Sequence, residues 1–176
     1  MGTPIPRPGA DEYAAFHAGY LAAVADEADA LTALERQAPA LAALATVSQE
    51  ASAHRYGEGK WSVRQVTGHI ADAERIMTVR LLRTARGDRT PLPGFEENAY
   101  VDGGAFDART QADLGAELLV IRAATLALVR SLSPDVLDRR TEINGWLLTV
   151  RAQAFIVAGH AGHHLRLLRE RYGLAL

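Results

Sequence analysis

Four stretches of the chain repeat apolar residues every three or four positions, with charged and polar residues between them. This spacing is typical of amphipathic α-helices, in which every third or fourth side chain lies on the same face. The four stretches are Asp29–Val47, Ser62–Arg86, Thr110–Ser131 and Thr149–Tyr172. Because each has one apolar face to bury, the pattern predicts an all-α fold built as a four-helix bundle.

The starts of the predicted helices contain residues that suit helix caps. Ser62, followed three positions later by Gln65, forms the S-x-x-Q pattern of a capping box. Thr110 and Thr149 are further N-caps, since a hydroxyl accepts a hydrogen bond from a free backbone N–H group of the first turn. Pro39 lies inside the first helix and removes a hydrogen bond there, so we expect a bend near residues 36–38 or two helical pieces.

The segments between the helices lack sustained periodicity. Residues 54–60 read as a connector, and Asn144 with Gly145 turns the chain before the last helix. Ser133 and Pro134 suit the start of a short helix. Residues 90–106 contain two prolines and three glycines, and a loop of this length in a small domain is usually functional or a crossover. We expect this long crossover loop to join the second helix to the third.

The N-terminal part differs from the bundle in composition. Residues 1–10 contain three prolines and are expected to form an extended arm, because proline removes a backbone donor and restricts the preceding residue. Aromatic residues at helical spacing predict a short helix within residues 11–25. We therefore expect residues 1–28 to pack on a single-domain bundle formed by residues 29–176.

Composition and charge exclude several classes of protein. Hydrophobic residues make up 48% of the chain, but no uncharged apolar run reaches a membrane span of roughly 18 residues. The first ten residues lack the apolar core of a secretory signal, so we expect a cytoplasmic protein. The formal charge is −2 with both signs interspersed, which favours neither nucleic acid nor a membrane as partner. Without cysteine, thiol chemistry requires a thiol from outside.

The last predicted helix contains the main candidate for chemistry. His160 and His164 are four residues apart and lie on one helical face, together with apolar residues such as Ile156 and Ala161. His163 lies toward the polar side. Two imidazoles on a buried face destabilise the fold unless their ring nitrogens have partners. They can be a hydrogen-bonded core pair, or they can bind a metal ion.

His69 on the second predicted helix can join this pair. A crossover long enough to return along the bundle makes the second and third helices parallel, and the fourth is then antiparallel to both. In that arrangement His69 lies level with His160 and His164. Three neutral imidazoles would leave coordination positions open, as in catalytic sites, and would suit zinc, nickel or another borderline divalent ion.

Other polar residues have both a functional and a structural interpretation. Asp72 and Glu74 can act as bases or support the ligands, but a helix-surface charge and an ion pair are the simpler roles. Arg80 can bind an anionic substrate or pair with Glu74. Packing is the expected role of Trp61 and Trp146. No chemical role is expected for His17, His54 and His163.

Three segments resemble the DinB/YfiT-like superfamily: GKWSVRQVTGHIADAERI, RLLRTARGDRTPLPGFEENAYV and RAQAFIVAGHAGHHLRLLRERY. The likeness covers nearly the whole chain from about residue 29. It implies a four-helix bundle in up-down-down-up order and a homodimer. It also implies one divalent metal ion per chain, often nickel or zinc, bound by His69, His160 and His164.

The resemblance leaves three functions open. The leading hypothesis is a metal-dependent transferase that activates a low-molecular-weight thiol, such as bacillithiol or mycothiol, toward a small electrophilic substrate. The second is a hydrolase that uses metal-bound hydroxide, with Asp72, Glu74 or a carboxylate of residues 96–102 as proton shuttle. The third is a non-enzymic, dimeric metal-binding module.

Overall fold

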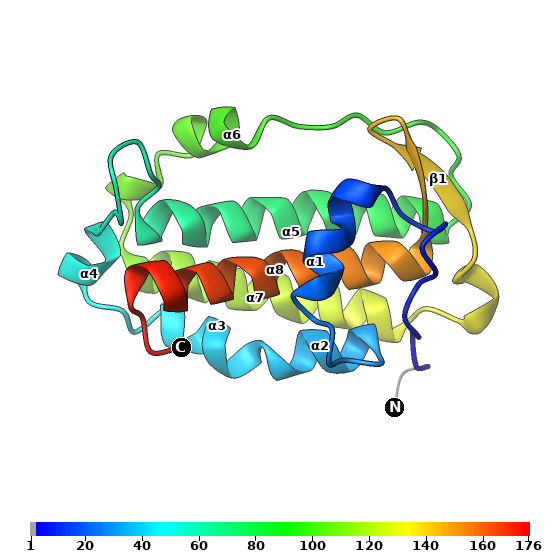
Figure 1. Ribbon diagram of the computed structural model, residues 1–176, viewed down its shortest axis with the longest axis horizontal. Helices are drawn as coiled ribbons and strands as arrows, with labels where there is room; N and C mark the ends of the chain where they lie inside the picture. Colours follow the sequence, from blue (N-terminus) through cyan, green and yellow to red (C-terminus); the bar gives the residue numbers. More distant parts are fainter. Residues whose placement is uncertain (1–2) are drawn as a thin grey trace.

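Long helices packed side by side form the body of the molecule (Figure 1). The computed structural model describes residues 3–176. One position of the bundle is filled by two short helices, α2 (Ala30–Arg36) and α3 (Ala38–Leu44). The other three are α5 (Val63–Ala85), α7 (Gln111–Arg130) and α8 (Val150–Tyr172). The predicted four-helix bundle is thus confirmed.

Hydrogen bonds at both ends of α5 show that α8 is antiparallel to it. The Tyr172 hydroxyl, at the end of α8, donates to the carbonyl of Trp61, just before α5. Gln153, near the start of α8, donates through Nε2 to the hydroxyl of Thr84, near the end of α5. The two helices therefore pack along their whole length in opposite directions.

By contrast, α7 runs parallel to α5. Gln111, the first residue of α7, donates to the Thr67 hydroxyl near the start of α5. About three turns later, Arg122 binds Glu74. Two parallel neighbours require a connection that returns along the bundle, and the segment between α5 and α7 makes this crossover above α5 (Figure 1).

The pair α2 and α3 runs opposite to α7. Gln111 also donates to the carbonyl of Leu44, at the end of α3, whereas Arg122 donates to the carbonyl of Leu34 in α2. With α5 and α7 parallel and α8 antiparallel to α5, the order is up-down-down-up. This is the order that the family resemblance implied.

The helix starts follow the predicted caps. Ser62 and Gln65 form a complete capping box, in which each side chain bonds the backbone of the other residue. The hydroxyls of Thr110 and Thr149 accept from the third residue of α7 and α8. Pro39 divides the first helix into two pieces, because its ring suits the first turn of a new helix and disrupts a continuous one.

Two regions that lack helical periodicity contain structure that the sequence did not reveal. The crossover includes a seven-residue helix, α6 (Glu97–Gly103), which is too short for its apolar period to be recognised. A second short helix, α4 (Gln49–Ala53), precedes the 54–60 connector.

A hairpin of β1 (Arg140–Ile143) and β2 (Trp146–Thr149) precedes α8, so the fold is not purely helical. The strands meet at the predicted turn, where Asn144 and Gly145 both have positive φ, as a two-residue hairpin turn requires. The short predicted helix after Ser133 is a single 3-10 turn, Pro134–Val136.

The N-terminal segment packs across the bundle. It contains a 3-10 turn (Ala15–His17) that leads into α1 (Ala18–Ala22), which lies against α8 (Figure 1). Arg7 fixes this segment, because its guanidinium donates to the carbonyls of Leu21, Val24 and Glu27 and lies 5.1 Å from the ring centre of Phe155.

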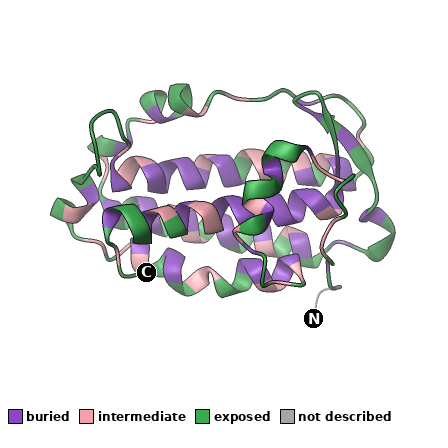
Figure 2. Cartoon of the chain, viewed as in Figure 1, coloured by how far each residue is buried: buried purple, intermediate pink, exposed green. Residues whose placement is uncertain are grey.

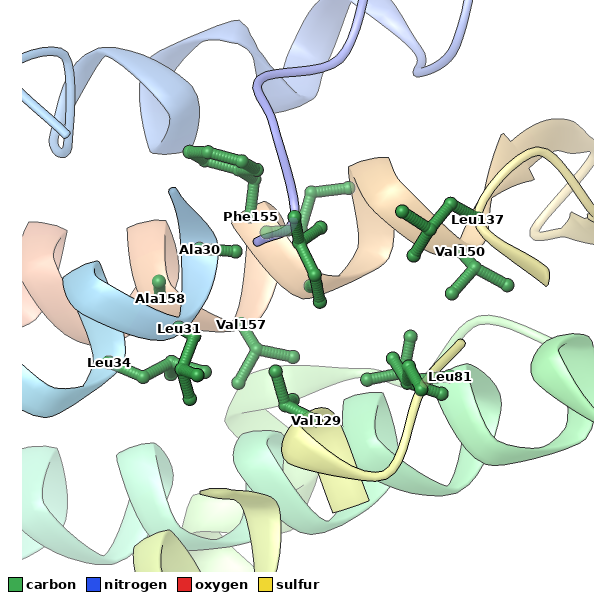
Figure 3. Close-up of a cluster of buried hydrophobic side chains, with 14 of the residues drawn as sticks. Ala30, Leu31, Leu34, Leu81, Val129, Leu137, Val150, Phe155, Val157 and Ala158 are labelled. Carbon is green, nitrogen blue, oxygen red and sulfur yellow. The ribbon is translucent and has the colours of Figure 1, made fainter. Parts of the chain in front are cut away.

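The apolar core fills the bundle from end to end. The inward faces of α5 and α8 are buried, whereas the loops and outer faces are exposed (Figure 2). In the half nearest the hairpin, Leu34, Leu81, Val129 and Val157 converge from four helices (Figure 3). In the other half, one core cluster includes Val66, Ile70, Leu118 and Leu165. Within residues 3–176, no helix has the length and apolar character needed to cross a membrane.

Candidate metal centre

The antiparallel packing of α5 and α8 brings His69, His160 and His164 together. One ring nitrogen from each lies within 4.8 Å of the others. The exposed fractions of the three residues are 2%, 1% and 7%. The four-residue spacing places two of the rings on one face of α8, and the register of α5 supplies the third, as expected from the sequence.

The ring nitrogens of this group lack ordinary partners. Nε2 of His69 lies 3.0 Å from Nε2 of His160. One of these atoms must carry a proton, or a cation must lie near both, because two lone pairs at this distance repel each other. The Nδ1 atom of His164 is buried without any partner among the described residues. Buried polar atoms left in this way destabilise a fold unless a ligand binds them.

Burial keeps these imidazoles neutral. It lowers the pKa of His69 to about 4, and the neighbouring charge of His163 adds to the effect. Burial also lowers the pKa of His160 and His164 well below the usual value, and the nearby His69 and His163 add to the effect on both. Neutral imidazole is the form that coordinates a metal, so at neutral pH no ligand proton has to be displaced.

Aromatic rings surround the three histidines. The ring of Trp61 lies 4.8 Å from that of His69, measured between centres, and the ring of Tyr20 lies 5.3 Å from that of His160. His163 packs against the outer side of the group, with its ring 5.0 Å from that of His164. The site therefore has apolar, aromatic walls, which strengthen electrostatic interactions inside it.

Two glycines next to the histidines allow neighbouring residues to pack closely against α5 and α8. A Cβ atom on Gly159, next to His160, would lie 2.2 Å from the backbone oxygen of Tyr20. A Cβ on Gly68, next to His69, would lie 2.3 Å from the ring of Phe106. The sequence contains a signal for this arrangement, since glycine directly precedes histidine at both positions. The position of Tyr20 beside His160 was not predicted, because the helical periodicity of the last helix does not show which other segment packs on it.

The two carboxylates predicted for catalysis lie outside this group of nitrogens. Asp72 is half-buried and pairs with Arg75, with Nη1 and Oδ1 separated by 3.2 Å. Burial raises the pKa of Asp72. Glu74 is 2% exposed and both its oxygens accept hydrogen bonds of 2.8 Å from Arg122. Glu74 thus forms the structural ion pair that was its simpler interpretation.

The remaining candidates are distributed along the molecule. Arg80 does not pair with Glu74; it donates to the carbonyl of Pro93 and lies over the ring of Phe95. Trp146, for which packing was the expected role, is 52% exposed, and its ring centre lies 6.4 Å from that of Phe16. His54 is exposed and lies beside Tyr172, whereas His17 is buried under the N-terminal turn.

The donor set suits a divalent ion. Three neutral imidazoles match the nitrogen preference of zinc and nickel and leave positions open for a water molecule or substrate. Such an ion would relieve the repulsion between the facing nitrogens of His69 and His160, and a ring nitrogen of His164 lies within 4.8 Å of both residues' ligand atoms. Among residues 3–176, no carboxylate hydrogen-bonds to any of the three rings, and three neutral ligands would not offset the charge of a bound cation.

Comparison with known proteins identifies a matching family and two similar proteins. The family model of the DinB superfamily matches residues 33–168. A protein of Oceanobacillus iheyensis named "putative metal-dependent hydrolase" is 26% identical over 123 residues, which are 68% of this chain and 69% of that protein. YfiT from Bacillus subtilis, described as "a probable metal-dependent hydrolase with an unusual four-helix bundle topology", has a TM-score of 0.70 and 19% identity over 97% of this chain and 95% of that chain. At this identity, the likeness to YfiT shows the fold alone.

Proposed function

The chain belongs to the DinB superfamily, and from this premise we propose that it is a hydrolase dependent on one divalent ion, zinc or nickel. The ligands would be His69, His160 and His164. The main support is the buried group of three neutral imidazoles, with ring nitrogens within 4.8 Å and with open coordination positions. The name of the similar protein from Oceanobacillus iheyensis contains "metal-dependent hydrolase", which also favours this reaction.

The surrounding residues would orient the substrate and exclude bulk water. A bound divalent ion supplies Lewis acidity, which polarises a carbonyl group and lowers the pKa of a water molecule. The rings of Tyr20 and Trp61 contact the ligands His160 and His69 and keep their immediate surroundings apolar. An apolar acyl group fits such walls better than a highly charged one.

For proton transfer we propose Asp72 rather than Glu74. Burial raises the pKa of Asp72, and only one of its oxygens pairs with Arg75. Both oxygens of Glu74 already accept hydrogen bonds from Arg122 in a buried ion pair. Glu97, in the 96–102 segment of the crossover, is a second candidate, because it is half-buried and burial raises its pKa.

Activity toward a panel of small esters and amides tests this proposal. Zinc- or nickel-loaded protein should hydrolyse at least one of them without added thiol, and His160→Ala should lose that activity. Asp72→Asn should slow the reaction about 10²–10⁴-fold, as expected for loss of a general base. Asp26→Asn, at an exposed position, serves as the control. Absence of hydrolysis across the panel with metal bound would contradict the proposal.

Transfer of an external thiol is the second candidate. An open divalent site converts a bound thiol to its thiolate, and the absence of cysteine means that the thiol must be a separate molecule such as bacillithiol or mycothiol. Loaded protein should then consume thiol and a model electrophile together, and His160→Ala should not. Turnover that is identical in His160→Ala would exclude this reaction.

The structural alternative and the oligomeric state are tested with the same samples. A non-enzymic dimeric module predicts a large fall in melting temperature on chelation, no turnover in either assay and no effect of thiol on the metal spectrum. The homodimer and the cytoplasmic location stay predictions. Sedimentation analysis, with and without metal, should show one species of twice the chain mass.

A further inference from the structure

A hollow of about 320 Å³ lies between α5 and the crossover. One side is formed by residues of α5 and the other by residues of the crossover: Arg75, Ile76, Val79 and Arg80 on α5, and Leu92, Pro93, Gly94, Phe95 and Tyr100 on the crossover. None of the three histidines lines it. Its volume lies at the lower end of the range of small-molecule sites, roughly 300–1,000 Å³.

The crossover side of the hollow is held in place by hydrogen bonds. The Leu92 amide donates to the carbonyl of Glu142, and the Asn144 amide donates to the carbonyl of Leu92, both at 2.9 Å. The crossover is thus attached to the hairpin. The rings of Phe95 and Tyr100 pack edge to face with their centres 5.1 Å apart. The hollow is therefore preformed, which lowers the entropic cost of binding a ligand.

Two arginines border the hollow, and only one of them has acidic partners. Arg75 pairs with Asp72 and with Glu117. Arg80 has no carboxylate within 4.0 Å among residues 3–176; it donates one hydrogen bond to the Pro93 carbonyl and lies 5.6 Å from the ring centre of Phe95. Arg80 is half-buried, so its charge is only partly screened by water. It therefore provides an uncompensated positive charge at the edge of the hollow.

Apolar and aromatic side chains form most of the remaining lining, and two of them are exposed to solvent. Val79 is 55% exposed and Tyr100 is 47% exposed, and Ile76, Leu92 and Phe95 complete the surface. Side chains of this kind bind flat apolar groups by stacking and burial. A guanidinium fixed on an aromatic ring binds carboxylates through two parallel hydrogen bonds.

We propose that this hollow binds a small molecule in which a carboxylate lies next to a flat apolar group, with the carboxylate on Arg80. Arg80 follows His69 on the same face of α5, about three turns and ~16 Å along the helix. A ligand bound at Arg80 would therefore lie on the same face of α5 as His69. Its identity as substrate rests on the proposed function, whereas its binding to the hollow does not.

Calorimetric titration with 3-phenylpropionate tests the binding. The full-length protein should bind this probe, and Arg80→Gln should weaken binding about tenfold or more. Arg83→Gln is the matched control, because Arg83 lies one turn further on α5, is paired with Asp88 and does not line the hollow. Its affinity should equal that of the wild type. The neutral alcohol 3-phenylpropanol lacks the carboxylate, and propionate lacks the ring. Both should bind about tenfold more weakly.

A second variant fills the hollow without changing its charge. Val79→Trp places a large ring at an exposed position, so it should fold normally and lose the probe. Unchanged affinity in both Arg80→Gln and Val79→Trp, or equal affinity for the acid and the alcohol, would overturn the proposal. If His69→Ala abolishes binding and Arg80→Gln does not, the acid binds the metal; this result would refute the hollow as the site while supporting the metal centre.

Discussion

Two buried polar clusters lie on α5 about one and a half turns apart, and they are built in opposite ways. In the first, Arg122 donates from Nε and Nη2 to both oxygens of Glu74. Its third nitrogen donates to the Leu34 carbonyl and to the side chain of Gln37. In the second, His69, His160 and His164 contact one another, and Nδ1 of His164 has no partner.

The difference separates a structural role from a functional one. The ion pair joins α2, α5 and α7, and every guanidinium nitrogen has an acceptor, so this cluster specifies how the helices meet. The histidines gain at most one hydrogen bond from one another, between His69 and His160, and this leaves Nδ1 of His164 buried without compensation for the loss of water. In the matched cluster, Glu74 with Arg122, the polar groups satisfy one another, and the cluster has a structural role. In the unmatched cluster, the three histidines, they do not, and the cluster is suited to a ligand.

The largest expected effect is the loss of one member of the matched cluster. Arg122→Met leaves the Glu74 carboxylate buried and unpaired, and urea unfolding should show a loss of about 3–5 kcal/mol. The double variant Glu74→Leu/Arg122→Met removes both charges and should recover most of this loss. A loss below about 1 kcal/mol for the single variant would contradict the structural role of this cluster, because the buried ion pair would then contribute little to the stability of the fold.

The next effect concerns the wall of the histidine cluster. In Gly159→Ala, the new methyl group meets the backbone oxygen of Tyr20, which cannot rotate away, so α1 must move from α8. We expect a loss of about 1–3 kcal/mol in unfolding free energy and weaker metal binding. Gly103→Ala is the control, since nothing lies within 4 Å of its Cβ position. Equal effects of the two variants would show that α1 does not shape the site.

A smaller effect should appear in the pH dependence of stability. Burial lowers the pKa of His17 to about 4, and the charge of Arg80 adds to this lowering. Between pH 6.5 and pH 4 the unfolded chain therefore binds more protons at His17 than the folded chain does, and stability falls as the pH falls. His17→Gln should reduce the slope by up to about 1.4 kcal/mol per pH unit. An unchanged slope would contradict the buried, neutral state of His17.

The smallest effect should come from an ion pair on the same helix as Arg122. Arg130 pairs with Glu35, but their side chains are 50% and 46% exposed. Water and salt screen such a pair, so Arg130→Ala should cost less than about 1 kcal/mol. If this variant costs as much as Arg122→Met, burial and complete hydrogen bonding do not explain the difference between the clusters.

Local signals in the sequence predict much of this structure. The caps at Ser62, Thr110 and Thr149 place the starts of three helices within a residue, and Pro39 correctly predicts a divided first helix. Helical spacing and the long crossover together place His69 level with the pair on α8. These features depend on neighbouring residues or on helix geometry, which the sequence contains directly.

Long-range partners could not be predicted in the same way. Arg122 lies between apolar positions of α7, and its partner Glu74 is on another helix, so no local pattern joins them. The position of Tyr20 over His160 depends on Gly159 and on the anchoring of the N-terminal segment by Arg7. The hairpin and α6 are each too short for their periodicity to exceed that of the surrounding loop.

We propose above all that His69, His160 and His164 form a divalent metal site. Titration of metal-free protein with cobalt, followed by its visible absorption, tests this claim most directly. The wild type should bind one ion per chain with a spectrum typical of nitrogen ligands at an open site, and His160→Ala should lose this binding. Stoichiometric binding that persists unchanged in His160→Ala, or no binding by the wild type, would contradict it.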